Sequence, residues 1–534
     1  MVSYAGAALA QNIGDLKKLM YYERWNSAEI NLQKLISSSP DNQEAYYWLT
    51  KVLLEKKDIP GAKLVQRELQ AWLAANAKVK EAPSSKVSAG ELLLHEGKLQ
   101  EAKAVFDQVL KESRNKKPEV MIAIARAYLD VKSTDYPYVL DLLSKAEKRD
   151  KKNAEIFALK GDVYRRLNDG SKAVKAYMEA LNKNESYAKA SYGMGKIYLT
   201  QNNPEMFLQY FNQAITKDPA YAPAYYELFY YYYFRDVNRA KQYLDKYIAN
   251  TDPSLENEYL VTDFLYASSQ PQLAIAKAKD LLEKEKENAQ PRLLKLIAYS
   301  YDAVGDSTQA LEYLQQYFAK EADSNYVPKD YELRAKLLSK FPGNGGEVIS
   351  SLERALEMDT LATNKAEYAA QLAEIYKKQD DRSNEAKWLG KIYQLKQDPT
   401  NLDLYHWGVA HYSAEEYFKA DSVFAAYTEK YPEHIHGFYW RAKSNALVDS
   451  TMENGLAAPF YLKVIDMAAG DTAENKSLLI QAYGYLGAYN ANVKKDFQLA
   501  LTNFEKILEL DPGNEDAVRY REILQKWVNA ETGN

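Results

Sequence analysis

The chain has 534 residues, a formal net charge of −5 and no cysteine. Without cysteine it has no disulfides, no thiol catalysis and no cysteine zinc site, and it lacks the residue that carries a lipoprotein's lipid anchor. No apolar run approaches the roughly 18 residues of a transmembrane helix, and no cluster of Lys and Arg indicates a phosphate-binding surface. We therefore expect no membrane span, no lipid anchor and no nucleic-acid partner.

The first ten residues, MVSYAGAALA, are small and apolar. Ala8-Leu9-Ala10 matches the small-x-small pattern that precedes signal-peptide cleavage. We expect residues 1–10 to be the remnant of a signal peptide, with Gln11 as the first mature residue and the periplasm as the location. The alternative is an alanine-rich N-terminus that frays, in a cytoplasmic protein.

Residues 11–253 carry a pattern of paired helices, which predicts an N-terminal repeat array. Each pair has small and apolar residues at helical spacing in both halves, with polar turn residues between them. Pro40 and Pro219 end two of the pairs, because proline cannot continue a helix. We expect a linker at Glu81–Lys86 and a longer turn at Ser133–Tyr138.

The segment from Ala154 to Ala220 shows the repeat most clearly. Two successive pairs match each other at an offset of 34 residues, a period typical of stacked helical repeats. Small residues let two antiparallel helices approach closely, so we expect an aromatic ring of one helix to fill the space beside a glycine of the other. Ser171 is the expected N-cap of the second helix of the first pair. The matched residues are Gly161 and Gly195, Tyr164 and Tyr198, Tyr177 and Phe211, and Ala180 and Ala214.

The spacing of Gly161, Tyr164, Ala173, Tyr177 and Ala180 resembles the tetratricopeptide repeat. The resemblance implies an all-α fold, a right-handed superhelical α-solenoid of helix-turn-helix repeats in which each hairpin buries its apolar face against its neighbours. The Tyr-, Asn- and Lys-rich composition also resembles exported tetratricopeptide proteins of the Bacteroidetes group.

The pattern weakens after residue 253. We expect residues 254–362 to form degenerate repeats with a bend, because one pair lacks the glycine and Phe341–Gly346 replaces a tight turn. The pattern recovers in residues 363–514, a predicted C-terminal array, and residues 515–534 are predicted to form a capping helix and a tail. Together these segments give about fourteen hairpins.

No set of residues indicates catalysis, a metal site or a cofactor. His406 and His411 are five residues apart, so they leave a helix on different sides, whereas helical metal ligands typically stand at i and i+4. Phe341–Gly346 is glycine-rich but lacks the Lys-Ser/Thr of a phosphate loop. We therefore predict that the protein is not an enzyme.

In tetratricopeptide proteins the first helix of each repeat lines the concave side, which is the usual binding surface. Carried over to this chain, the resemblance places eight side chains in that groove, and their alternative role is packing between neighbouring hairpins. The carboxylate clamp of the chaperone-binding members is missing, because Ala158, Asp162, Tyr192 and Lys196 occupy its places. The eight predicted groove residues are Tyr192, Tyr226, Tyr230, Tyr233, Lys295, Tyr299, Tyr405 and Tyr412.

Three hypotheses of function follow. The first is a non-catalytic scaffold in the periplasm that binds a peptide or a partner protein in its concave groove. The second is a structural subunit of an outer-membrane assembly or secretion complex. The third is a carbohydrate-binding or enzymatic envelope protein. Tyr outnumbers Phe by 45 to 15, and rigid amphipathic tyrosine rings suit a peptide-binding surface.

Overall fold

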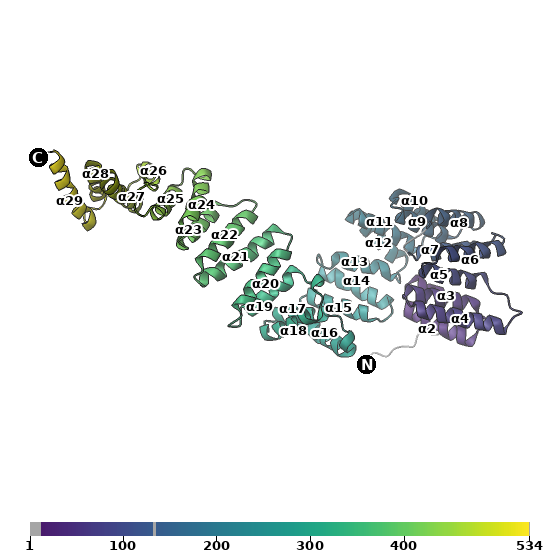
Figure 1. Cartoon of the computed structure of the whole chain (residues 1–534). Coiled ribbons are helices and arrows are strands. Elements are labelled where there is room, and N and C mark those ends of the chain that lie inside the picture. Colours follow the sequence, from purple (N-terminus) through teal and green to yellow (C-terminus); the bar gives the residue numbers. More distant parts are fainter. Residues whose placement is uncertain (1–11, 132–134, 533–534) are drawn as a thin grey trace. The chain divides into compact units, whose positions relative to one another are not determined.

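The computed structural model describes residues 12–131 and 135–532. These ranges contain 29 α-helices, three short helical segments of other types and no strand (Figure 1). The all-α solenoid prediction is confirmed, and the 29 helices correspond to the predicted fourteen hairpins followed by one further helix. The predicted signal-peptide remnant at residues 1–10 lies outside the described residues.

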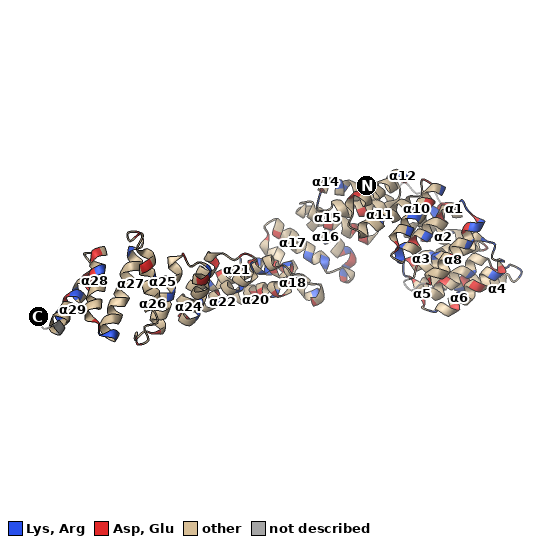
Figure 2. Ribbon diagram, turned by 90° about the horizontal axis from the view of Figure 1, so that it is seen from above, with Lys and Arg blue, Asp and Glu red and all other residues tan. Residues whose placement is uncertain are grey.

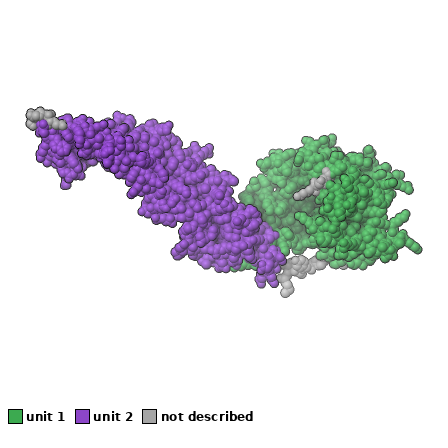
Figure 3. All heavy atoms as spheres, in the orientation of Figure 1, with its two compact units in different colours: residues 1–281 green, residues 282–534 purple. Residues whose placement is uncertain are grey.

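The chain divides into two compact units, residues 1–281 and 282–534 (Figure 3). The boundary falls within helix α16 (Pro271–Glu285) and within the segment predicted to be degenerate. That segment nevertheless forms helical hairpins like the others, and the bend expected there stays a prediction.

In unit 1 the helices follow one another as antiparallel pairs. No helix in the described ranges of either unit is both long enough and apolar enough to cross a membrane. Before α16 the helices are α1 (Ile13–Tyr21), α2 (Trp25–Ser38), α3 (Gln43–Glu55), α4 (Ile59–Ala75), α5 (Pro83–His95), α6 (Leu99–Glu112), α7 (Pro118–Leu129), α8 (Tyr136–Arg149), α9 (Ala154–Arg166), α10 (Gly170–Lys183), α11 (Ala188–Thr200), α12 (Pro204–Lys217), α13 (Ala222–Tyr232), α14 (Val237–Asn250) and α15 (Leu255–Ala267).

Unit 2 continues the same alternation of first and second helices. Short 3₁₀ segments follow α16 and α18, and a π-helical turn at Asn490–Lys494 extends α27. Its helices are α17 (Arg292–Ala303), α18 (Ser307–Lys320), α19 (Pro328–Leu338), α20 (Gly345–Met358), α21 (Ala362–Lys378), α22 (Arg382–Leu395), α23 (Asn401–Ser413), α24 (Tyr417–Lys430), α25 (Ile435–Val448), α26 (Ala458–Ala468), α27 (Lys476–Tyr489), α28 (Phe497–Leu510) and α29 (Glu515–Thr532).

Several hairpins turn in the same way between their two helices. One residue adopts a positive φ, and the next residue, an Asp or Asn, caps the second helix by accepting a hydrogen bond from its backbone. Asp169 does this for α10, so the prediction of Ser171 as N-cap was wrong. The pairs of turn residue and cap are Lys57 and Asp58, Asn168 and Asp169, Asn202 and Asn203, Gly305 and Asp306, Asp380 and Asp381, and Lys495 and Asp496.

The linker predicted at Glu81–Lys86 is largely helix. Pro83 occupies the first turn of α5, where its missing N–H costs nothing and its fixed φ suits the helix. Ser85 is buried and donates a hydrogen bond to Gln43 at 3.2 Å. A Pro-Ser-Ser run therefore begins a helix here and is not a loop.

The predicted packing of aromatic rings against glycine is confirmed. A Cβ atom added to Gly195 would lie 2.4 Å from the Phe211 ring, and one added to Gly161 would lie 2.5 Å from the Tyr177 ring. Tyr177 also packs against Gly193 of the next hairpin, where an added Cβ would lie 2.5 Å away. The small residues thus set how closely each first helix approaches its second helix, and they fix the stacking.

Candidate functional site

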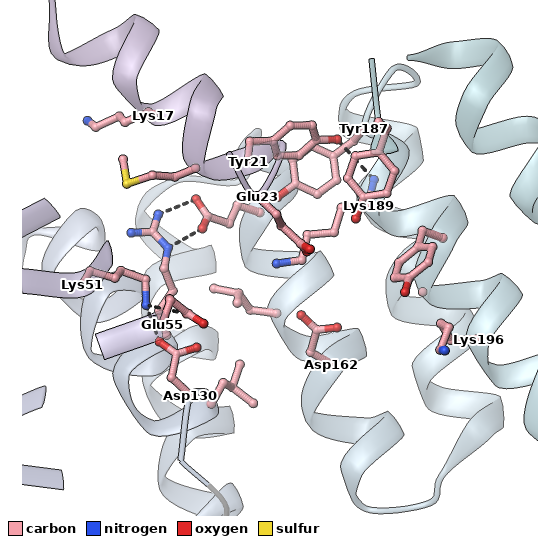
Figure 4. Close-up of a pocket in the computed structure, with 18 of the residues that line it drawn as sticks. Lys17, Tyr21, Glu23, Lys51, Glu55, Asp130, Asp162, Tyr187, Lys189 and Lys196 are labelled. Atoms are coloured by element: carbon pink, nitrogen blue, oxygen red, sulfur yellow. Dashed lines mark hydrogen bonds and ion pairs between the residues drawn. The ribbon is translucent and has the colours of Figure 1, made fainter. Parts of the chain in front are cut away.

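Unit 1 contains a cavity of about 600 Å³, which we call the groove (Figure 4). Its lining comes mainly from first helices of the hairpins: α1, α3, α7, α9 and α11. First helices therefore face this cavity, and its use as a binding surface stays a prediction. The lining side chains are unusually mixed, because charged, aromatic and apolar groups all face the same space.

One side of the groove is built around the Lys51 ammonium (Figure 4). Lys51 pairs with Asp130, with Glu91 at 3.2 Å and with Glu55 at 3.7 Å. Burial disfavours the charged lysine, but Asp130 and Glu91 outweigh it and hold the pKa of Lys51 well above its ordinary value. Burial raises the pKa of Glu91 to about 7. One cation therefore serves three carboxyl groups, and this side of the groove is acidic.

Arg126 of α7 forms the second fixed pair. Its guanidinium donates two hydrogen bonds to Glu155, at 2.5 and 2.7 Å, and lies 5.2 Å from the Trp48 ring centroid. Burial raises the pKa of Glu155, but Arg126 outweighs this effect and lowers it. Charge-assisted bidentate bonds of this kind are geometrically rigid, so Arg126 and Glu155 belong to the wall of the groove.

Tyrosines and two lysines form the opposite side. Tyr21 and Tyr187 lie 5.7 Å apart between ring centroids, and Tyr21 and Tyr221 lie 5.5 Å apart. Lys196 and Tyr192 both donate hydrogen bonds to Glu227, at 2.7 and 3.2 Å. Burial and the nearby Glu227 raise the pKa of Tyr192, so its hydroxyl stays protonated.

Two charged side chains in the groove, Glu23 and Lys189, are available to a ligand. Among the described residues, neither the Glu23 carboxylate nor the Lys189 ammonium makes a hydrogen bond or an ion pair through its charged group. The surrounding helices raise the pKa of Glu23 by burial, and Lys189 opposes this shift. Both groups point into the space between the two sides (Figure 4). The groove therefore offers one acceptor and one donor to a ligand, beside tyrosine rings.

Of the four tyrosines predicted for unit 1, only Tyr192 lines the groove. Tyr226 packs on Tyr230 and Tyr247, with ring centroids 4.8 and 5.2 Å away. Tyr233 donates a hydrogen bond to the Asp263 carbonyl and packs on Phe229. Tyr226 and Tyr233 therefore pack outside the groove, whereas Tyr230 contacts Tyr226 but keeps 52% of its surface exposed.

Lys295 and Tyr299, predicted for the binding face in unit 2, converge on one buried carboxylate. Lys295 pairs with Asp330 at 2.6 Å, and Tyr299 donates a hydrogen bond to it at 2.9 Å. Asp330 is fully buried and also accepts the Val327 N–H. The two side chains connect α17 to α19, so their observed contacts are those of inter-hairpin packing.

Tyr405 and Tyr412 both pack on Trp440, at 6.2 and 5.0 Å between centroids. A separate cavity of about 310 Å³ lies on α21, α22 and α23 and is lined by His406 but by neither tyrosine. His411 faces the other way, toward Glu416 and Trp407, as the five-residue spacing predicted.

The groove includes residues that the sequence analysis missed. Tyr187 and Tyr221 stand one period of 34 residues apart, directly before α11 and α13, so the repeat itself was a signal for them. Lys189 and the residues of α1 carried no such signal, since their place depends on how the stack curves. In the described part of the chain no cluster of three or more His, Asp or Glu side chains could hold a metal ion.

Comparisons with known proteins agree with this architecture. A family model described as a tetratricopeptide repeat-like domain matches residues 41–194, and one described as a tetratricopeptide repeat matches residues 188–221. No curated protein matches the sequence.

Solved structures of tetratricopeptide proteins also resemble the chain. The C-terminal part of a repeat-containing protein from Cytophaga hutchinsonii is 27% identical over 49% of this chain and 98% of that chain, with a TM-score of 0.30. A tetratricopeptide repeat protein from Parabacteroides merdae is 16% identical over 55% and 98%, with a TM-score of 0.25. The repeat period, the hairpin turns, the glycine–aromatic packing and the two family models identify residues 41–221 as tetratricopeptide repeats, and the rest of the described chain continues the same fold of helical hairpins.

Proposed function

We propose that the protein is a non-catalytic scaffold that binds an extended segment of a partner protein in the groove of unit 1. The observation that carries the proposal is the groove itself, about 600 Å³ lined by side chains from successive first helices. A folded surface would not fit such a space, whereas a peptide strand presents its side chains in alternation to both sides.

The chemistry of the lining supports a peptide ligand. Tyr21, Tyr187 and Tyr192 offer rigid rings with few rotatable bonds, which bind at low entropic cost. Lys189 and Glu23 can serve a peptide carbonyl or carboxylate and an N–H or ammonium group, respectively. Acidic and basic residues are interspersed along the helices (Figure 2), so long-range attraction to a strongly charged partner is not expected.

Site-specific photo-crosslinking in the native cell tests this proposal. A benzophenone amino acid replaces Lys189 in the groove, and in a matched control it replaces Lys175, an exposed residue of the second helix α10. Discrete adducts from position 189 that are absent from position 175 support the groove. Equal adduct patterns from both positions, or none from 189, refute it.

The periplasmic location stays a separate proposal, supported by the Ala8-Leu9-Ala10 pattern. Cell fractionation with antibody detection tests it directly. Detection of the protein only in the cytoplasm would refute the periplasmic location and would not affect the proposal of binding in the groove.

A further inference from the structure

The first hairpin of unit 1 touches residues that follow it by about 170 to 230 positions. Tyr21 and Tyr22 end α1 and reach the hairpins of α11 to α13. The Lys189 N–H donates a hydrogen bond to the Tyr21 hydroxyl at 3.2 Å, and the Tyr22 hydroxyl donates one to Asp218 at 3.3 Å. The stack of hairpins in unit 1 therefore closes on itself.

A second contact joins the first hairpin to the later hairpins of unit 1, a junction that we call the seam. This contact also supplies the N-cap that α2 lacks. In six other hairpins the residue after the positive-φ turn is Asp or Asn and caps its own second helix. In the first hairpin the turn residue is Glu23 and the next is Arg24, which caps nothing. The cap comes instead from Asp252, which accepts the Ser27 backbone N–H at 2.9 Å.

Burial and hydrogen bonds hold the Asp252 side chain in position to cap α2. It is buried, with 8% of its surface exposed, and it also accepts hydrogen bonds from the Ser27 hydroxyl at 2.5 Å and from Arg24 at 3.3 Å. Its backbone carbonyl accepts a hydrogen bond from Asn257 at 2.9 Å, which fixes the connection between α14 and α15. Three donors of the first hairpin thus meet one carboxylate in the connection between α14 and α15.

The seam and the groove share residues. Tyr21 forms part of the seam and also lines the groove, and Glu23, in the turn between α1 and α2, points into the groove. The hydrogen bonds across the seam come from side chains and from the backbone N–H groups of Ser27 and Lys189, near helix ends, whereas α2 packs along α3. The seam is therefore the place where this ring of hairpins can separate without disturbing the stacking elsewhere.

We propose that the hairpin α1–α2 is a gate over the groove, held shut by Asp252 and by Tyr21 and Tyr22. Opening the gate admits a segment whose ends are blocked by folded domains, and closing it encircles that segment. The proposal concerns access to the groove, and its use in binding rests on the proposed function.

Distances between two spin labels test the gate. The chain has no cysteine, so Ile30→Cys on α2 and Lys246→Cys on α14, both exposed, take labels specifically. We expect one narrow distance distribution in the parent chain, and a second, longer population when Asp252→Ala is added. Asp169→Ala, which removes a local cap of α10, is the matched control and should leave the distances unchanged.

A narrow, unshifted distribution in the Asp252→Ala chain overturns the gate, as does a broad distribution in the parent. If the Asp252→Ala chain loses its helical circular dichroism, the double variant Arg24→Ala, Tyr22→Phe replaces it. We then expect part of the distance distribution to shift to longer distances. The distance measurement needs no partner, so it can refute the gate while crosslinks at position 189 still support binding in the groove. The opposite combination of results would support the gate and refute binding in the groove.

Discussion

Replacing Gly195 by alanine tests the packing that defines each hairpin. The added Cβ would lie 2.4 and 2.5 Å from two carbons of the Phe211 ring, whereas carbon atoms pack at about 3.5–4.0 Å. Phe211 is 1% exposed and is flanked by Phe207 and Tyr192, at 6.0 and 5.8 Å between centroids. The ring therefore has no free space into which it can withdraw by the required ångström or so.

The expected magnitude follows from two opposing terms. Overpacking a core costs about 1–3 kcal/mol, and alanine is favoured over glycine in a helix by about 1 kcal/mol. With so rigid a neighbour we place the cost in the upper half of its range, which leaves a net destabilisation of about 1–2 kcal/mol. That loss raises the population of the opened hairpin by about 5- to 30-fold.

Hydrogen exchange read by mass spectrometry is the appropriate assay, since repeat proteins open locally and not as one unit. Amides of α11 and α12 should exchange about 5 to 30 times faster in the Gly195→Ala chain. Gly346→Ala is the control, because its Cβ would meet no atom of the described chain within 4 Å; protection of α20 should stay or increase. Unchanged protection of α11 and α12 would refute the assigned role of the glycine.

Two further predictions concern buried charges. Burial raises the pKa of Glu91 from 4.5 to about 7, so its contribution to the free energy of unfolding is complete below about pH 4.5 and is lost as the pH rises through 7. We expect Glu91→Gln to reduce the fall of the urea midpoint between pH 5 and 8. An unchanged slope would show that Lys51 and Asp130 compensate fully. Lys295→Met leaves the Asp330 carboxylate buried without its cation and should cost about 3 kcal/mol, seen as faster exchange in α17 and α19, and adding Asp330→Asn should recover most of it. Equal exchange in the single and double variants would contradict the role given to the ion pair.

Much of the fold is predictable from the sequence because the repeat is local. The 34-residue offset, the glycine opposite an aromatic ring and the Asp or Asn that follows several of the turns all act within one hairpin or its neighbour. The error at Ser171 has a simple cause: Asp169 directly follows the positive-φ residue Asn168, and the turn is tighter than a Ser N-cap two residues later would require. Pro83 similarly begins a helix because the first helical position tolerates proline.

The candidate site is less predictable, because it depends on curvature accumulated over many hairpins. Tyr192 was identified from its position in the repeat, but Tyr226 and Tyr233 one hairpin later pack against their own neighbours. Lys295 was assigned to the groove by the same rule, and only the structure reveals the buried Asp330 that uses it. Closure of the first hairpin onto Asp252 joins residues 225 positions apart, and no local pattern encodes it.

The central claim is that a partner occupies the inner face of unit 1, and hydrogen exchange of the chain with and without its captured partner tests it most directly. We predict slower exchange in the first helices α1, α3, α7, α9 and α11, with exchange in the second helices α4, α8 and α10 unchanged. Protection confined to the second helices, or to unit 2, would contradict it.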